Sequence, residues 1–287
     1  MLTNRLMSSP GLRRLAWRAG RRLYSAARGE EQANDIGGNG EAYVQACVLR
    51  AMPADAPAAI VDIGANQGDW TATLLAQLPP ERRISGLLRL ELFEPVPATA
   101  ASLRGRLAKI DPAGIANVTC AAVSDAPGAA RMAVMSATGG TNSLHFDSDD
   151  AREALEFVEV EKLTLTQFCD ARGIARLHLA KCDTEGHDLN VLRGARDLLA
   201  AGRIDVFQFE YNHRWIQARS FLKDVFDLVD GMPYKVARIQ PGGIEVFEAW
   251  HPELDRFFQS NYLLVREPAL GWFNARRGRF DDANTYA

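Results

Sequence analysis

The chain contains the stretch Ile60-Val61-Asp62-Ile63-Gly64-Ala65-Asn66-Gln67-Gly68-Asp69-Trp70, in which a short apolar strand runs into a glycine-containing turn. Residues 71–78 follow with a helix-like pattern. Glycines permit a tight strand-to-helix turn in which backbone N–H groups approach a ligand closely. The stretch therefore predicts the first unit of an α/β fold, with a ligand at the turn.

A second unit follows about 30 residues later. Residues 87–93 are typical of a strand, and Glu94-Pro95 closes it. A carboxylate at the end of the second strand is where a Rossmann-like fold holds a ribose diol. Two such units make nucleoside binding the leading hypothesis.

The glycine spacing argues against a dinucleotide. A dinucleotide fingerprint needs glycines at its first, third and sixth positions, whereas Gly64 and Gly68 are four residues apart with Ala65 and Asn66 between them. No Gly-Lys-Ser/Thr follows to form a P-loop. A ligand that carries a ribose but no phosphate, such as S-adenosylmethionine, fits better, and an NAD(P)-dependent sugar oxidoreductase is disfavoured.

Composition places the chain among soluble globular proteins: 287 residues, 47% hydrophobic and 24% charged. Its longest apolar runs fall short of the roughly 20 residues that a membrane span needs. The four cysteines show neither C-x-x-C nor Cys/His metal spacing and give no sign of a disulfide framework. The expected location is the cytoplasm.

Charge is concentrated at the N-terminus. Residues 1–29 contain seven arginines and no acid, whereas the remainder has 26 basic and 36 acidic residues, a net charge of −10. Apolar residues recur at helical spacing among these arginines: Leu12, Leu15, Ala16, Ala19 and Leu23. Three interpretations stay open: an amphipathic helix on an anionic membrane surface, an organelle-targeting peptide, or a loosely docked leader.

From residue 60 onward, strand and helix patterns alternate, which predicts a mostly parallel sheet covered on both faces. Further strands are expected at 118–123, 131–135, 158–160, 177–182 and 205–211, with helices at 97–110, 164–172 and 189–201. A polar loop at 136–143 is expected to border the site. Residues 234–239, 244–250 and 261–266 are typical of strands that close a sheet, and the tail after Pro268 is expected to be weakly ordered.

The motifs, in this order, resemble the FkbM-type methyltransferases: Asp62-x-Gly64-Ala65-Asn66-x-Gly68, Phe93-Glu94-Pro95, Ala122-Val123-Ser124-Asp125, Lys181-x-Asp183-x-Glu185-Gly186, Val191-Leu192-x-Gly194-Ala195 and Phe209-Glu210-Tyr211. The likeness covers roughly residues 58 to 267. It implies a class I S-adenosylmethionine-dependent fold: an α/β Rossmann-like, seven-stranded, mostly parallel sheet with the last strand antiparallel and helices on both faces. It also implies O-methylation of hydroxyl groups, often on sugars, glycolipids or polyketide-type metabolites.

The resemblance also assigns roles in cofactor binding. Gly64, Ala65, Asn66 and Gly68 would shape the loop against the methionine portion, and Glu94 would accept hydrogen bonds from both ribose hydroxyls. Asp62 would support the loop or the cofactor's ammonium group. Two further residues, Ser124 and Asp125, would border the adenine ring. Asp188 stands where the family more often has glutamate, which keeps a carboxylate in place.

Methyl transfer to a sugar hydroxyl benefits from a base that takes the hydroxyl proton. The candidates are Asp183, Glu185, His187 and His213, with Asp183 favoured and His213 second. The acidic cluster at residues 183–188, joined by Glu210, could instead hold Mg²⁺ beside a sugar diol. A helix that begins near Gly186 would break that geometry, so a hydrogen-bonded network is the preferred explanation.

Two other classes remain to be weighed. A nucleic-acid methyltransferase would need a basic face and an Asn/Asp-Pro-Pro-aromatic segment, where this chain has Cys182-Asp183-Thr184-Glu185. A non-catalytic binding or assembly protein could use the same fold. Gly64, Gly68 and Glu94, all present, argue against that alternative.

The sequence therefore predicts a basic N-terminal extension at 1–40, a methyltransferase domain at 41–267 and a C-terminal tail at 268–287. The expected function is S-adenosylmethionine-dependent O-methylation of a sugar, glycolipid or glycosylated secondary metabolite. The protein would be cytoplasmic, with peripheral membrane contact through residues 1–29 as an open alternative. No nucleic-acid partner is expected.

Overall fold

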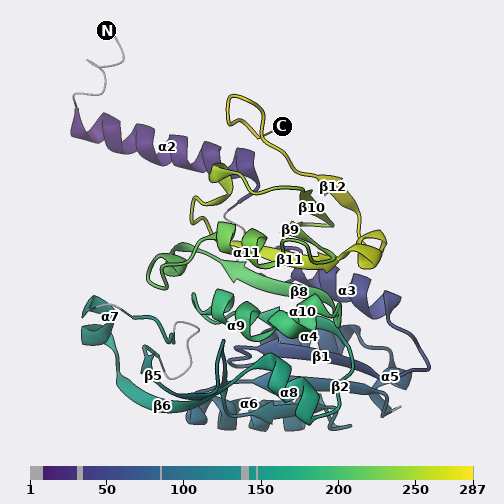
Figure 1. Cartoon of the computed structure of the whole chain (residues 1–287). Coiled ribbons are helices and arrows are strands. Elements are labelled where there is room, and N and C mark those ends of the chain that lie inside the picture. The colour runs from purple at the N-terminus through teal and green to yellow at the C-terminus, as the bar shows by residue number, and fades with distance from the viewer. Residues whose placement is uncertain (1–8, 31–34, 85, 137–141, 147, 287) are drawn as a thin grey trace.

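The structure, a computed structural model, describes residues 9–30, 35–84, 86–136, 142–146 and 148–286 (Figure 1). Its central strand is β1 (Ala58–Ile63), which is buried along its whole length. The apolar run of β1 suits a strand covered on both faces. After a turn, α4 (Asp69–Gln77) begins directly after Gly68, two residues before the helix-like pattern predicted at 71–78.

Within the described part of the chain, the main sheet has nine strands in the order β12-β10-β9-β11-β8-β7-β1-β2-β3. Five neighbours run parallel: β3 (Ala116–Thr119), β2 (Leu88–Phe93), β1, β7 (Leu177–Cys182) and β8 (Ile204–Tyr211). The next strand, β11 (Ser260–Arg266), is antiparallel to both β8 and β9 (Tyr234–Gln240). The mostly parallel α/β sheet is confirmed.

The predicted count of seven strands is wrong. Two strands extend the sheet beyond β9: β10 (Gly243–Phe247), which is antiparallel to β9, and β12 (Ala275–Arg277), which is parallel to β10. β12 lies in the tail that the sequence predicts to be weakly ordered. Its exposed side chains give no apolar pattern, so the backbone pairing has no signal in the sequence.

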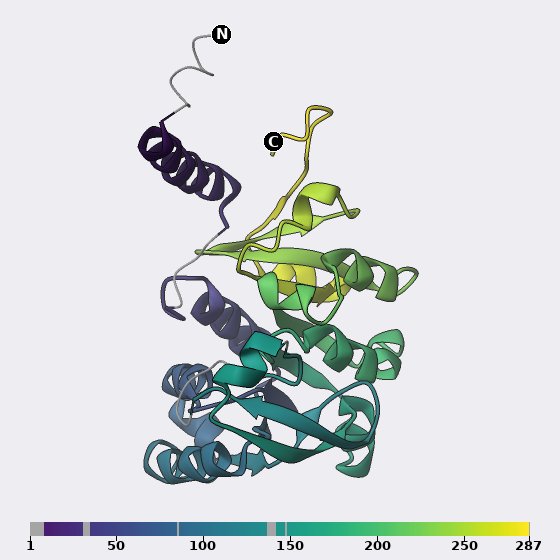
Figure 2. The same ribbon diagram turned by 90° about the vertical axis from the view of Figure 1, so that its left-hand side faces the viewer.

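Helices cover both faces of the sheet (Figures 1 and 2). Alternate residues of β1 enter two different cores: Ala59, Val61 and Ile63 in one, Ala58 and Ile60 in the other. The first core includes residues of α8 (Leu165–Ala171), α9 (Asp188–Gly194), α10 (Arg196–Ala200) and α11 (Leu222–Leu228). The second includes residues of α3 (Glu41–Ala51), α4 and α6 (Pro97–Ile110). A short helix, α5 (Pro80–Ile84), precedes β2.

The predicted helix at 189–201 is two helices, because the chain turns between α9 and α10. Gly194 lies so close to the Ser124 carbonyl that a Cβ there would be 1.9 Å from the oxygen. The glycine of this motif therefore allows α9 to pack against the end of β4.

A second, three-stranded sheet has the order β4-β6-β5. Its strands are β4 (Ala122–Val123), β5 (Gly128–Val134) and β6 (Glu156–Leu163), and α7 (Ser148–Glu153) precedes β6. The prediction of a single strand at 118–123 is therefore wrong. β3 pairs with β2 in the main sheet, whereas β4 pairs with β6 in the three-stranded sheet. Of the polar loop predicted at 136–143, residues 137–141 lie outside the described residues.

At the N-terminus, α2 (Pro10–Arg28) stands away from the sheets (Figure 2). Three short 3-10 helices, η1 (His213–Ile216), η2 (Pro252–Leu254) and η3 (Glu267–Trp272), connect elements of the C-terminal half. Among the described residues, no helix is long and apolar enough to cross a membrane.

Candidate functional site

The loop between β1 and α4 is shaped by backbone conformations with positive φ. Gly64, Asn66 and Gly68 have φ of 74°, 48° and 82°. A Cβ on Gly64 would lie 2.0 Å from the Asp183 carbonyl oxygen. The N–H groups of Gly64 and Ala65 donate to the Phe93 carbonyl at 3.0 and 2.9 Å. Gly64 therefore joins the carboxyl ends of β1, β2 and β7 in one place.

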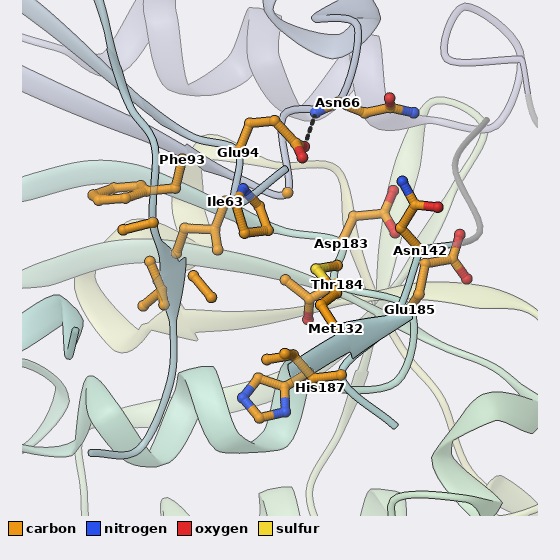
Figure 3. Close-up of a pocket in the computed structure, with 16 residues that line it drawn as sticks. Ile63, Asn66, Phe93, Glu94, Met132, Asn142, Asp183, Thr184, Glu185 and His187 are labelled. Atoms are coloured by element: carbon orange, nitrogen blue, oxygen red, sulfur yellow. Dashed lines mark hydrogen bonds between the residues drawn. The ribbon is translucent and has the colours of Figure 1, made fainter. Parts of the chain in front are cut away.

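Glu94 is fixed beside this loop. One carboxylate oxygen accepts a hydrogen bond from the Asn66 N–H at 3.0 Å (Figure 3). The other accepts one from the Val96 N–H, also at 3.0 Å. Burial raises the pKa of Glu94, and these two hydrogen bonds oppose the rise. Each oxygen keeps a lone pair for a further donor.

Glu94 borders a cavity of about 650 Å³, a volume that includes space open to solvent. Its other walls are mostly apolar, and they come from β1, β2, the three-stranded sheet and the segment that follows β5: Ile63, Phe93, Ala122, Val123, Met132 and Leu144. Figure 3 shows Ile63, Phe93 and Met132 among the side chains between Glu94 and His187. We call this the apolar cavity.

A second, polar cavity lies against the same loop. Four residues border both cavities: Gly64, Asn66, Asp183 and Glu185. The polar cavity is also lined by side chains from distant parts of the chain: Asn39, Glu41, Lys181, Glu210, Gln259 and Asn261. The two cavities therefore meet at the end of β7.

Lys181 provides positive charge beneath this junction. Its ammonium nitrogen lies 3.3 Å from an Asp62 carboxylate oxygen and 3.5 Å from one of Asp183. Burial lowers the pKa of Lys181, but the charges of Asp62, Asp183 and Glu41 outweigh it, so the pKa lies above its ordinary value. Asp62 also accepts a hydrogen bond from the Thr71 hydroxyl at 2.7 Å. Asp62 thus supports the loop from below and lines neither cavity.

Two carboxyl groups of the polar cavity, those of Glu185 and Glu210, have raised pKa values. Burial, followed by the charge of Asp183, raises the pKa of Glu185 to about 8, although Arg214 lies 2.8 Å away and opposes the rise. The same two causes raise the pKa of Glu210 well above its ordinary value. Amides satisfy Glu210: Asn212 donates at 2.6 Å and Gln259 at 2.8 Å.

Glu185 also has a positive φ, 53°, which is uncommon for a residue with a side chain. Gly186 follows with a φ of 96°, and its Cβ would meet the Arg214 backbone at 2.9 Å. This strained turn directs the Glu185 carboxylate toward both cavities, and strain of this kind is concentrated at functional sites.

A histidine network closes the other end of the apolar cavity. His187 Nδ1 accepts from the Asn190 amide at 3.2 Å, which leaves its Nε2–H to donate to the Ser124 hydroxyl at 2.9 Å. Ser124 in turn donates to Asp125 at 2.9 Å, and His145 lies 2.9 Å from His187 Nδ1. Burial, followed by His145, lowers the pKa of His187 to about 3, so the imidazole is neutral.

The predicted site residues are therefore partly brought together. Loop residues Gly64, Ala65 and Asn66 border the cavities with Glu94, Asp183 and Glu185, and Gly68 ends the loop against Leu103. Ser124 is buried behind His187 and Asp125 is exposed, and neither lines the apolar cavity. The exposed His213 lies in a separate groove beside α2, so its position lends no support to a role as base.

Sequence reasoning missed several lining residues. Met132, Asn142 and Leu144 come from the three-stranded sheet and its loop, and Asn39 and Glu41 from the segment before β1. Of these segments, only the polar loop at 136–143 is predicted from the sequence to border the site, and its residue Asn142 lines the apolar cavity. Among the described residues, no group of three or more His, Cys, Asp or Glu side chains is arranged to hold a metal ion.

The residues present suit a nucleoside with an amino-acid tail. Gly64 leaves the space that a Cβ would fill, Glu94 supplies acceptors for a diol, and the apolar walls fit a flat base. S-adenosylmethionine has these parts, and binding it is general for methyltransferases of this fold.

Comparison with solved structures gives distant likenesses. The methyltransferase FkbM of Methylobacillus flagellatus KT is 16% identical, with a TM-score of 0.44, and the match covers 72% of this chain and 43% of that one. An rRNA methylase from Streptococcus thermophilus is 11% identical, with a TM-score of 0.40, and the match covers 78% and 94%. The chain thus spans less than half the length of the FkbM structure.

A comparison with curated proteins gives no significant match. The family comparison is decisive, because residues 62–254, about two thirds of the sequence, match the Methyltransferase FkbM domain. That match contains the loop, Glu94 and the acidic turn after β7. The chain belongs to the FkbM methyltransferase family.

Proposed function

We propose that this protein is an S-adenosylmethionine-dependent O-methyltransferase that acts on a hydroxyl of a sugar, glycolipid or glycosylated secondary metabolite. The observation that carries the proposal is the junction of the two cavities. An apolar cavity with Glu94 meets a polar cavity rich in carboxylates and amides at Gly64, Asn66, Asp183 and Glu185.

The apolar cavity is the proposed cofactor site. Glu94 binds the ribose hydroxyls, and Phe93, Val123 and Met132 enclose the base. The backbone of the loop and Asn66 orient the remainder of the cofactor toward the junction. When bound, S-adenosylmethionine supplies a methyl group that is already activated on a sulfonium.

The polar cavity is the proposed acceptor site. Carboxylates and amides line it, and such groups exchange hydrogen bonds with the several hydroxyls of a sugar. Asn39 precedes α3, whereas Gln259 and Asn261 lie around the start of β11, and together they line the cavity from two distant parts of the chain. The alternative of a non-catalytic binding protein would need no carboxylate at the junction.

Glu185 is the proposed base, and Asp183 orients the acceptor hydroxyl. At a pKa of about 8, Glu185 is mostly protonated at neutral pH, and its ionised form, which carries out the step, is a stronger base than an ordinary glutamate carboxylate. The Lys181 ammonium group lies 3.5 Å from an Asp183 carboxylate oxygen and holds that side chain in place. Asp183 therefore acts as a fixed acceptor of a hydrogen bond.

Calorimetric titration with S-adenosylhomocysteine tests the cofactor site. We expect the wild type to bind, and Glu94→Gln to lose about tenfold or more in affinity. The carboxylate of Glu94 accepts from the N–H groups of both Asn66 and Val96, whereas an amide can accept from only one of them with its oxygen and turns an N–H group toward the other. The control is Glu81→Gln, an exposed position in α5. Folded wild type that binds no S-adenosylhomocysteine would refute the enzyme proposal and favour the non-catalytic alternative.

A further inference from the structure

The helix α2 exposes an unusual amount of apolar surface. Leu12, Leu15, Trp17 and Leu23 are 47%, 65%, 74% and 73% exposed. Its buried residues are confined to the C-terminal end, Ser25 and Arg28. In Figures 1 and 2 the helix projects beside the body of the molecule.

The C-terminal end of α2 is firmly attached. Arg28 lies 2.5 Å from a Glu30 carboxylate and 2.8 Å from that of Glu253, and it is almost fully buried. The Tyr24 hydroxyl donates to Glu253 at 2.8 Å. A buried ion pair with additional hydrogen bonds restricts orientation, so α2 is held at one end and presents the rest of its length outward.

Its exposed residues separate into faces. At about 100° per residue, Leu12, Leu15, Ala19 and Leu23 fall on one side of the helix. The exposed arginines Arg14, Arg18 and Arg22 follow each other at intervals of four and form an adjacent row. A third side, with Trp17 and Tyr24, lines an apolar groove against Ile216, Phe257 and Phe258. The leucine face is thus turned away from the body.

The positive charge of residues 1–29 favours a negatively charged partner for α2. The arginines of residues 1–29 have no acid among them, while the rest of the chain has a net charge of −10. Two copies of α2 packed face to face would bring rows of like charge together, which disfavours a dimer through this helix. A leucine face beside a row of arginines suits a helix that lies in the headgroup region of an anionic bilayer.

We propose that α2 docks this protein on an anionic lipid surface, with Leu12, Leu15 and Leu23 inserted and Arg14, Arg18 and Arg22 at the headgroups. This docking goes beyond the proposed methyl transfer and does not depend on it.

Docking by α2 would turn a particular side of the molecule to the membrane. His213 of η1 lies in the groove beside α2, and η1 follows directly after the carboxyl end of β8. The loops of the two cavities also follow the carboxyl ends of strands, at β1, β2 and β7. The docked helix therefore lies at the edge of the sheet from which the site opens, which suits an acceptor carried by a membrane lipid.

Vesicle co-sedimentation of the full chain tests the proposal. The probes are vesicles of phosphatidylcholine alone and of phosphatidylcholine with 30% phosphatidylglycerol. We expect binding to the anionic vesicles, weakened at high salt, and little binding to the neutral ones. Arg14→Gln/Arg18→Gln/Arg22→Gln should lower partitioning on the order of a hundredfold, given a contribution of roughly fivefold per arginine. Leu15→Glu/Leu23→Glu should abolish it.

The matched control is Arg104→Gln/Arg193→Gln/Arg196→Gln, which removes three exposed arginines from α6, α9 and α10 and leaves α2 intact. This variant has the same net charge as the arginine variant of α2 and should bind like the wild type. Equal loss in both variants would refute docking by α2, as would binding that survives Leu15→Glu/Leu23→Glu. Absence of vesicle binding, with a dimer in sedimentation velocity that the leucine variant dissociates, would assign the leucine face to a second copy and overturn the proposal.

Discussion

Gly64 shows how one residue joins three strands. Its φ of 74° is one that residues with a Cβ adopt at a cost, and the Asp183 carbonyl occupies the space that a side chain would need. The loop can approach both β7 and a ligand only because this Cβ is missing. The glycine of the Asp-x-Gly motif is thus needed both for packing of the loop against β7 and for approach of a ligand.

We expect Gly64→Ala to lower the free energy of unfolding by about 2–4 kcal/mol and to weaken binding of S-adenosylhomocysteine. Chemical unfolding measures the first effect and calorimetry the second. Gly105→Ala is the control, because Gly105 lies within α6 with nothing within 4 Å of its Cβ position. That change should raise the free energy of unfolding by about 0.5–1 kcal/mol. Equal stability of Gly64→Ala and wild type would contradict the described contact.

Glu185 should titrate far from an ordinary glutamate. Its pKa of about 8, raised by burial and by Asp183, is measurable by carbon-13 NMR of the side-chain carboxyl, with Glu185→Gln identifying the resonance. Arg214→Gln should move the titration to higher pH, because the guanidinium favours the carboxylate. A resonance that titrates below pH 5 would refute the assignment of Glu185 as base.

The sign of the effect of Glu185 on stability follows from linkage. Its pKa in the folded state lies above that of an unfolded glutamate, about 4.3, so between these values the native state binds more protons. The contribution of this group to stability is therefore full below pH 4.3 and decreases as the pH rises toward 8.

At the scale of elements, the three-stranded sheet is where the structure differs from the strand pattern predicted from the sequence. The apolar run at 118–123 is continuous in sequence, yet β3 and β4 belong to different sheets. The apolar pattern predicts that both segments form strands. Which strand each one pairs with depends on residues of β2 and β6, which are not part of the run itself. The separation lets Ala122, Val123 and Met132 form one wall of the apolar cavity.

The strand β12 provides a prediction at the same scale. Deletion of residues 275–287 removes the partner of β10 and the ring of Phe280, which stacks on Phe247 with centroids 6.5 Å apart. We expect the free energy of unfolding to fall by about 1–3 kcal/mol, measured by urea denaturation. Arg277→Ala, an exposed substitution in β12, is the control and should leave stability within about 0.5 kcal/mol. An unchanged urea midpoint after the deletion would show that β12 does not stabilise the sheet.

For the whole molecule, the site is assembled from segments far apart in the chain. Asn39 and Asn261 line the same polar cavity as Asp183, and each comes from a different end of the sequence. Charge is also distributed unevenly over the whole molecule: the basic helix α2 is attached through Arg28 to a body with a negative net charge. The attachment fixes the direction in which the helix faces relative to the site.

Local signals determined much of this structure. The turn after β1, Glu94 at the end of β2, the acidic turn after β7 and the family itself follow from the sequence, because glycine spacing and strand-end carboxylates have short-range physical causes. The tertiary structure alone decided the number of strands, the placement of Ser124 behind His187, the separation of His213 from both cavities and the entry of Asn39 and Glu41 into the site. These features depend on contacts between segments far apart along the chain, and no periodicity within one segment records which distant segment it will meet.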